Sequence, residues 1–186
     1  MANSPLNDLI NKFGADVVEK AMQNLGVTRT VKGKKRRAVA SGTLQKSLAY
    51  YYNAKKGTVE FFAKGQASKY ADFVEQGVNG RKVNHNSPYS FSKPMVNIEA
   101  IKRWMSIKPI KVRDKSGKFI KQTPENIEHA AMNIARAISS RGIAPLFYWR
   151  DAIEQMVNVY EQQFAEALGK EIKIVIEDNL QKKIKV

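Results

Sequence analysis

Apolar residues at helical spacing predict a long helix at each end of the chain. Ser4 as N-cap and Pro5 open the first helix, and Gly26 ends it. The last helix begins near Trp149 and has the strongest periodicity in the sequence. Its apolar stripe comprises Trp149, Ala152, Ile153, Met156, Val157, Tyr160, Phe164 and Leu168. The same spacing continues to Ile184, so we expect a helical tail, with Gly169 as the position where the helix could break.

The segment between residues 48 and 77 predicts a β-hairpin followed by a short helix. Leu48–Asn53 and Thr58–Ala63 are rich in aromatic and β-branched residues, and a short loop that ends in glycine separates them. Because adjacent side chains of a strand point to opposite faces, about half of these aromatic residues must face the core. Ser68–Gln76 has apolar residues on one helical face, and Gly77 ends it.

Two further helices are predicted in the second half, at Asn97–Ser106 and from Thr123 to Gly142. Residues 107–122, between them, alternate around a Ser-Gly turn and predict a protruding basic β-hairpin. Residues 78–94 form a loop rich in Gly, Asn, Ser and Pro, whose length favours a binding or contact role.

These elements predict an α+β fold. We expect a small antiparallel sheet packed against the N-terminal helix and the long C-terminal helix, with the basic hairpin protruding. The length suits a single domain over residues 1–186, with a flexible basic arm at 27–40 and an inserted hairpin at 107–122.

The formal net charge of +15 is unevenly placed. Residues 1–124 carry 24 Lys and Arg against 8 Asp and Glu, whereas residues 125–186 are nearly balanced. Six cations without an acid lie between Val27 and Arg37, and six lie between Lys108 and Lys121. Such fields attract nucleic acid or an acidic protein surface, although charged loops can also serve solubility alone.

No catalytic or metal-binding set is visible in the sequence. There is no cysteine, and His85 and His129 do not share a metal-ligand spacing. The acids are scattered, and no phosphate-binding glycine loop occurs, so we expect no enzyme, metal or cofactor. The N-terminus lacks the pattern of a signal peptide and no apolar run is long enough to span a bilayer, so we expect no membrane association.

Three short segments carry a resemblance to a known family. Residues 41–44 read Ser-Gly-Thr-Leu, residues 70–77 read Tyr-Ala-Asp-Phe-Val-Glu-Gln-Gly, and residues 138–147 include Arg-Gly-Ile-Ala-Pro-Leu-Phe. They resemble the TGxLrxSI, YAxyvExG and IxxrGixPxxF segments of the small neck and tail-completion proteins of tailed bacteriophages, the HK97-type head–tail connector family. The basic segments 27–40 and 107–122 depart from that pattern.

The resemblance implies a structural virion protein that forms a dodecameric ring in the neck. The homo-oligomer would contact portal or adaptor proteins and tail proteins, with the genomic DNA in its channel, after assembly in the host cytoplasm. The residues expected to contact DNA or a partner are Arg36, Arg37, Arg81, Lys82, His85, Lys111, Arg113 and Lys118. The residues expected to form structural corners are Gly42, Glu75, Gly77, Gly142 and Pro145.

Two rival functions and one residue role stay open at the level of the sequence. The chain could be a nucleic-acid-binding protein outside the virion that uses the basic arm, or a metal-dependent nuclease, which the scattered acids do not favour. Glu75 could bond to the adjoining loop as part of a corner, or it could be an ordinary exposed acid of a helix.

Overall fold

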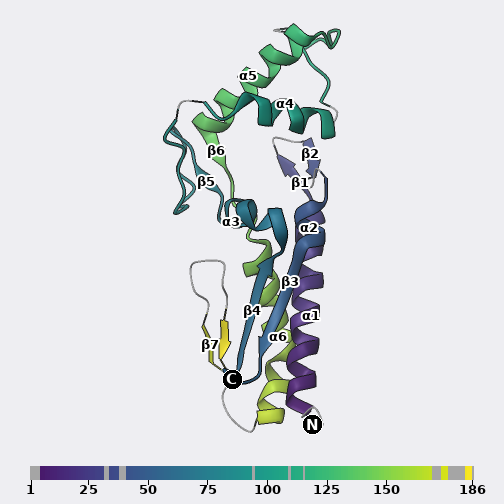
Figure 1. Ribbon diagram of the computed structural model, residues 1–186, viewed down its shortest axis with the longest axis vertical. Helices are drawn as coiled ribbons and strands as arrows, with labels where there is room; N and C mark the ends of the chain where they lie inside the picture. The colour runs from purple at the N-terminus through teal and green to yellow at the C-terminus, as the bar shows by residue number, and fades with distance from the viewer. Residues whose placement is uncertain are drawn as a thin grey trace. The chain divides into compact units, whose positions relative to one another are not determined.

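The chain forms two compact units, which are described separately (Figure 1). The first comprises residues 1–75 and 146–186, and the second is the intervening segment 76–145. The computed structural model describes residues 5–31, 34–37, 41–93, 95–108, 110–114, 116–168, 173–175 and 183–185.

The first unit is built around two long helices and a β-hairpin. Helix α1 (Pro5–Gly26) and helix α6 (Tyr148–Leu168) lie side by side, and strands β3 (Leu48–Asn53) and β4 (Thr58–Ala63) pack against them (Figure 1). The two strands are antiparallel. The shorter elements are β1 (Thr28–Val31), β2 (Lys34–Arg37), α2 (Thr43–Ser47), the 3-10 helix η1 (Gly65–Ala67), α3 (Ser68–Gln76), β7 (Lys173–Val175) and β8 (Lys183–Lys185).

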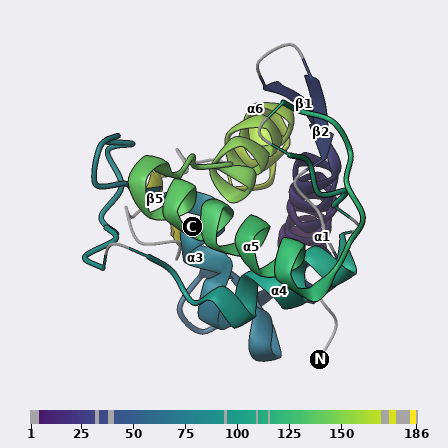
Figure 2. The same ribbon diagram turned by 90° about the horizontal axis from the view of Figure 1, so that it is seen from above.

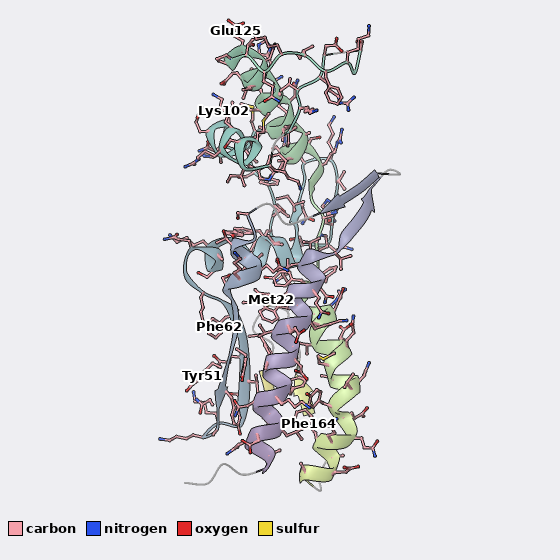
Figure 3. All side chains as sticks on the ribbon, turned by 90° about the vertical axis from the view of Figure 1, so that its right-hand side faces the viewer. Met22, Tyr51, Phe62, Lys102, Glu125 and Phe164 are labelled. Carbon is pink, nitrogen blue, oxygen red and sulfur yellow. The ribbon has the colours of Figure 1, made fainter. Side chains whose placement is uncertain are left out.

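Aromatic rings from three elements form the centre of the first core. The fully buried ring of Phe13 on α1 meets Phe61, Tyr160 and Phe164 edge-on, with ring centroids 6.3, 5.5 and 5.4 Å away. Phe61 on β4 also contacts Trp149 at the start of α6. Figure 3 shows Phe164 on α6, beside α1. Such ring pairs contribute about 0.5–1.5 kcal/mol each beyond the area they bury.

The opposite face of the hairpin carries an exposed aromatic pair. Ala49 lies opposite Phe62 and Tyr51 lies opposite Glu60, so Tyr51 and Phe62 share one face of the sheet. Their side chains are 55% and 40% exposed and project away from α1 (Figure 3). We call Tyr51 and Phe62 the aromatic sheet face.

In the second unit, helix α4 (Ile98–Ile107) packs against helix α5 (Pro124–Arg141) (Figure 2). Their buried residues include Met105, Ala131 and Val112, the last from the segment between the helices. Strands β5 (Val78–Asn79) and β6 (Gly142–Ile143) pair antiparallel where the chain enters and leaves the unit.

The predicted fold class is confirmed. The structure is α+β, with the N-terminal helix α1 and the long helix α6 in the first unit and a small antiparallel sheet packed against them. Strands β3 and β4 and helix α3 have the predicted bounds, and the other predicted helices agree to within about a residue, except at the C-terminal end of the last helix. Among the described residues, no helix is both long enough and apolar enough to cross a membrane.

The predicted helical tail is wrong where the structure describes it. Residues 173–175 and 183–185 are strands: β7 pairs with β8, and β8 pairs with β4. Ile174 lies opposite Ile184, and Ile184 lies opposite Val59. The alternating isoleucines suit a strand, and an edge of β4 supplies the backbone partners that a strand requires.

The two basic segments differ in structure. Residues 27–40 include the antiparallel pair β1 and β2, whereas the sequence predicts a flexible loop or arm; residues 32–33 and 38–40 lie outside the described residues. The sequence predicts a β-hairpin in residues 107–122, but the described part of this segment contains no strand; residues 109 and 115 lie outside the described residues. The described residues form a turn that an antiparallel bridge between Arg113 and Phe119 closes. Val112 is only 5% exposed, so this segment also supplies part of the core of the second unit.

Alkaline pH is expected to weaken the first unit through Tyr160. Burial, followed by the hydrogen bond that its hydroxyl donates to Asp16, raises the pKa of Tyr160 to about 12. Tyrosine in an unfolded chain ionises near pH 10. The stabilisation that comes from the raised pKa of Tyr160 is therefore complete below about pH 10 and is lost between about pH 10 and 12. We expect a fall of roughly 2 kcal/mol in the free energy of unfolding.

Urea unfolding across this pH range tests the assignment. Tyr160→Phe should reduce the fall, while the exposed control Tyr51→Phe should leave it unchanged. Equal falls in the wild type and Tyr160→Phe would contradict it.

Candidate functional site

The carboxylate of Glu75 holds the N-terminus of α6. Its side chain is buried, and its two oxygens accept hydrogen bonds from the backbone N–H groups of Trp149 (2.8 Å) and Arg150 (3.0 Å). The first N–H groups of a helix have no partner inside the helix, and this end of the helix dipole is positive. A negative charge from α3 therefore caps a helix that begins more than seventy residues later in the chain.

Backbone hydrogen bonds join the same two segments. The carbonyl groups of Val74 and Glu75 accept from the N–H groups of Leu146 (3.1 Å) and Phe147 (3.0 Å). The buried Tyr148 hydroxyl donates to the carbonyl of Ala71, and burial together with the nearby Glu75 charge raises the pKa of Tyr148. The end of α3 and the start of α6 thus form one corner.

The predicted corner glycines lie at backbone conformations that favour glycine. Gly42 precedes α2 with φ 77°, and Gly77 follows α3 with φ 73°. A side chain at Gly77 would collide with the carbonyl of Ile143 and approach the nitrogen of Pro145 at 2.7 Å. Gly142, with φ 75°, ends α5 and lies against the backbone of Val78.

The loop after β5 satisfies the last carbonyl groups of α5. The N–H groups of Arg81 and Lys82 donate to the carbonyls of Ser139 (3.0 Å) and Ser140 (2.8 Å). The ring Nε2 of His85 lies 2.8 Å from the carbonyl of Arg141, where it acts as the donor. The last carbonyl groups of a helix have no partner inside the helix. Here the backbone N–H groups of the loop bind two of them, which fixes the loop to the end of α5.

A groove in the second unit gathers cations from this loop and from α5. It has a volume of about 560 Å³ and is lined by Arg81, Lys82, Met95, Arg136 and Ser140, which we call the basic groove. Arg136 and Ser140 are one helical turn apart on α5, while Arg81 and Lys82 follow β5.

The other predicted contact residues lie elsewhere. Arg113 stacks on the Phe119 ring at 3.8 Å and Lys111 lies 5.5 Å from it, which makes a local cation–π cluster on the turn. The backbone N–H of Lys118 donates to the Asp114 carboxylate. Arg36 and Arg37 are on β2 in the first unit, opposite Arg29 and Thr28.

Sequence reasoning missed Arg136 and the ordering role of Asn79. The side-chain oxygen of Asn79 accepts from the N–H groups of His85 (2.7 Å) and Ser87 (3.2 Å), which folds the loop back on itself. The four-residue spacing in the sequence predicts that Arg136 and Ser140 lie on the same face of their helix. No sequence pattern predicts that this face lies beside Arg81.

Comparisons with protein-family models, curated proteins and solved structures find no significant match. Within the part of the chain that the structure describes, no group of three or more His, Cys, Asp or Glu side chains could hold a metal ion. The described residues thus offer two separate features, the Glu75 corner of the first unit and the basic groove of the second.

Proposed function

We propose that this protein is a subunit of an oligomeric ring in the neck of a tailed bacteriophage, where it joins head and tail around the DNA channel. One observation carries the proposal: the segments that resemble the connector family, residues 70–77 and 138–147, meet. Val74 and Glu75 bond to the backbone of Leu146 and Phe147, and Gly77 packs against Pro145. Two distant segments that form paired backbone contacts behave as a single motif.

The first unit offers surfaces suited to lateral contacts between subunits. A closed ring requires two unlike surfaces that mate head-to-tail. Aromatic side chains are enriched at the centres of protein interfaces, and the aromatic sheet face presents two of them to solvent. Among the described strands, β3 pairs only with β4, which leaves an edge to which a neighbour could add a strand.

The wider assembly follows from the same proposal. A dodecameric ring would lie between portal or adaptor proteins and the tail proteins. Its aromatic sheet face would then be covered by an adjacent subunit in the virion.

Particle assembly provides the test. Phage that lack this protein should produce filled heads and separate tails, and the wild-type protein supplied in trans should restore joined particles. Tyr51→Ser combined with Phe62→Ser should fail to restore them, because the interface loses two aromatic anchors. Electron microscopy and infectivity measure the result, and circular dichroism checks the fold of the variant.

Ile107→Ser is the matched control, since Ile107 is also an exposed large apolar residue, 56% exposed, but lies in the second unit. It should restore joined particles. Normal particles without the protein would overturn the proposed function. A protein absent from particles that purifies with nucleic acid would favour the nucleic-acid-binding alternative.

A further inference from the structure

The cations of the basic groove have no acidic partner among the described residues. Arg81 and Lys82 are exposed, and their side chains and that of Arg136 make no ion pair or hydrogen bond there. Three such cations around one groove repel one another, and an anion relieves that repulsion. A negatively charged ligand would therefore be the chemically matched occupant of this groove.

The walls of the groove are held in place before any ligand binds. The fully buried hydroxyl of Ser139 donates to the carbonyl of Lys93 (2.5 Å), while the carbonyl of Ser139 accepts from Arg81. Asn79 also fixes the loop from inside. One residue of α5 thus anchors both ends of the loop, so ordering of the backbone is not a cost of binding.

The chemistry of the groove favours an extended polyanion over a single phosphate group. The N–H groups of Arg81 and Lys82 already donate to α5, so they cannot form the backbone cradle typical of a site for one phosphate. Only long, mobile cationic side chains remain. Such side chains make the sequence-independent contacts that proteins use on nucleic-acid phosphates.

The charge of the surrounding unit points to the same ligand. Residues 76–145 contain 13 Lys and Arg and only 4 Asp and Glu. Three of these acids are already engaged: Glu99 and Glu128 bind Lys102, and Asp114 closes the turn before Lys118. A nucleic acid has a dense row of charges that matches so large an uncompensated excess.

We infer that the basic groove binds the phosphate backbone of nucleic acid without reading its sequence, through Arg81, Lys82 and Arg136. This inference goes beyond the ring proposal, because an isolated subunit suffices for it. The two can fail separately: a chain that joins heads to tails need not bind DNA through this groove, and a DNA-binding chain need not form a ring.

The test measures fluorescence anisotropy of a labelled duplex DNA of mixed sequence with the full chain over a range of salt concentrations. The variant Arg81→Gln, Lys82→Gln and Arg136→Gln should bind at least about tenfold more weakly. The slope of log K against log salt concentration is negative, and its magnitude should decrease by about 2 to 3. Each phosphate that the protein no longer neutralises accounts for about 0.9 of this decrease.

The matched control is Lys55→Gln, Lys56→Gln and Lys64→Gln, which removes the same charge from exposed positions of the first unit. It should change affinity much less than the groove variant. Equal weakening in both variants would show attraction by net charge alone and overturn the inference. No binding by the wild type at low salt would also overturn it.

Two further measurements test the location of the site and the class of ligand. Arg36→Gln with Arg37→Gln should retain most of the affinity, and sole dependence on this pair would place the site on β2 instead. Polyglutamate should compete far less well than unlabelled DNA. Equal competition would identify an acidic protein surface as the ligand class and overturn the assignment to nucleic acid.

Discussion

Replacing Glu75 by alanine is expected to lower the free energy of unfolding by about 3 kcal/mol. The substitution removes both acceptors of the first N–H groups of α6 and the negative charge at the positive end of that helix. The N–H of Trp149 is buried at this position, so water cannot replace the carboxylate without opening the corner. Urea unfolding followed by circular dichroism measures the change.

Two variants separate capping from the general loss of an acid. Glu75→Gln keeps one acceptor but removes the charge and brings an amide group toward the helix N–H groups, so we expect about half of the loss. Glu154→Ala removes an exposed carboxylate from α6. Its Oε1 lies 3.8 Å from Nε of Arg150, a weak surface ion pair. That control should change stability by less than about 0.5 kcal/mol. If Glu75→Ala were no worse than Glu154→Ala, the capping role would be wrong.

Local pattern was sufficient for most helices and for the main hairpin. Apolar periodicity and end signals located α1 and α5, because Pro5, Gly26, Thr123 and Pro124 act on the backbone within one turn. Alternation and β-branched or aromatic residues located β3 and β4 in the same way. Each of these signals concerns residues that are neighbours in sequence.

What the sequence left open depends on distant partners. Strands β5 and β6 have two residues each, too short for any periodicity, and exist because Val78 pairs with Ile143. The described residues of the tail form strands β7 and β8 because β8 pairs with the edge of β4, which is distant in sequence. From the sequence alone, Glu75 on its helix is as compatible with an exposed position as with a buried one. It is buried because the backbone of Trp149 and Arg150, distant in sequence, packs against it.

The second unit should be most sensitive at Gly142. Gly142→Ala is expected to destabilise that unit by about 3 kcal/mol, from backbone strain and steric overlap together. Gly142 has φ 75° and ψ −167°, a conformation that essentially only glycine adopts. An added Cβ would collide with the Val78 carbonyl and lie 2.5 Å from the Gly80 nitrogen and 2.9 Å from the His85 ring. The neighbours are mainly backbone, so they cannot move aside separately.

Gly117→Ala is the control that divides strain from overlap. Gly117 also has a positive φ, 85°, but an added Cβ would meet nothing within 4 Å. Strain alone should cost it about 1 kcal/mol. Hydrogen exchange locates the difference: Gly142→Ala should speed exchange of the Arg81 and Lys82 N–H groups, which cap α5, while Gly117→Ala should leave them protected. Equal exchange in the two variants would show that the β5–β6 pair tolerates a side chain and that close backbone packing does not hold the basic groove together.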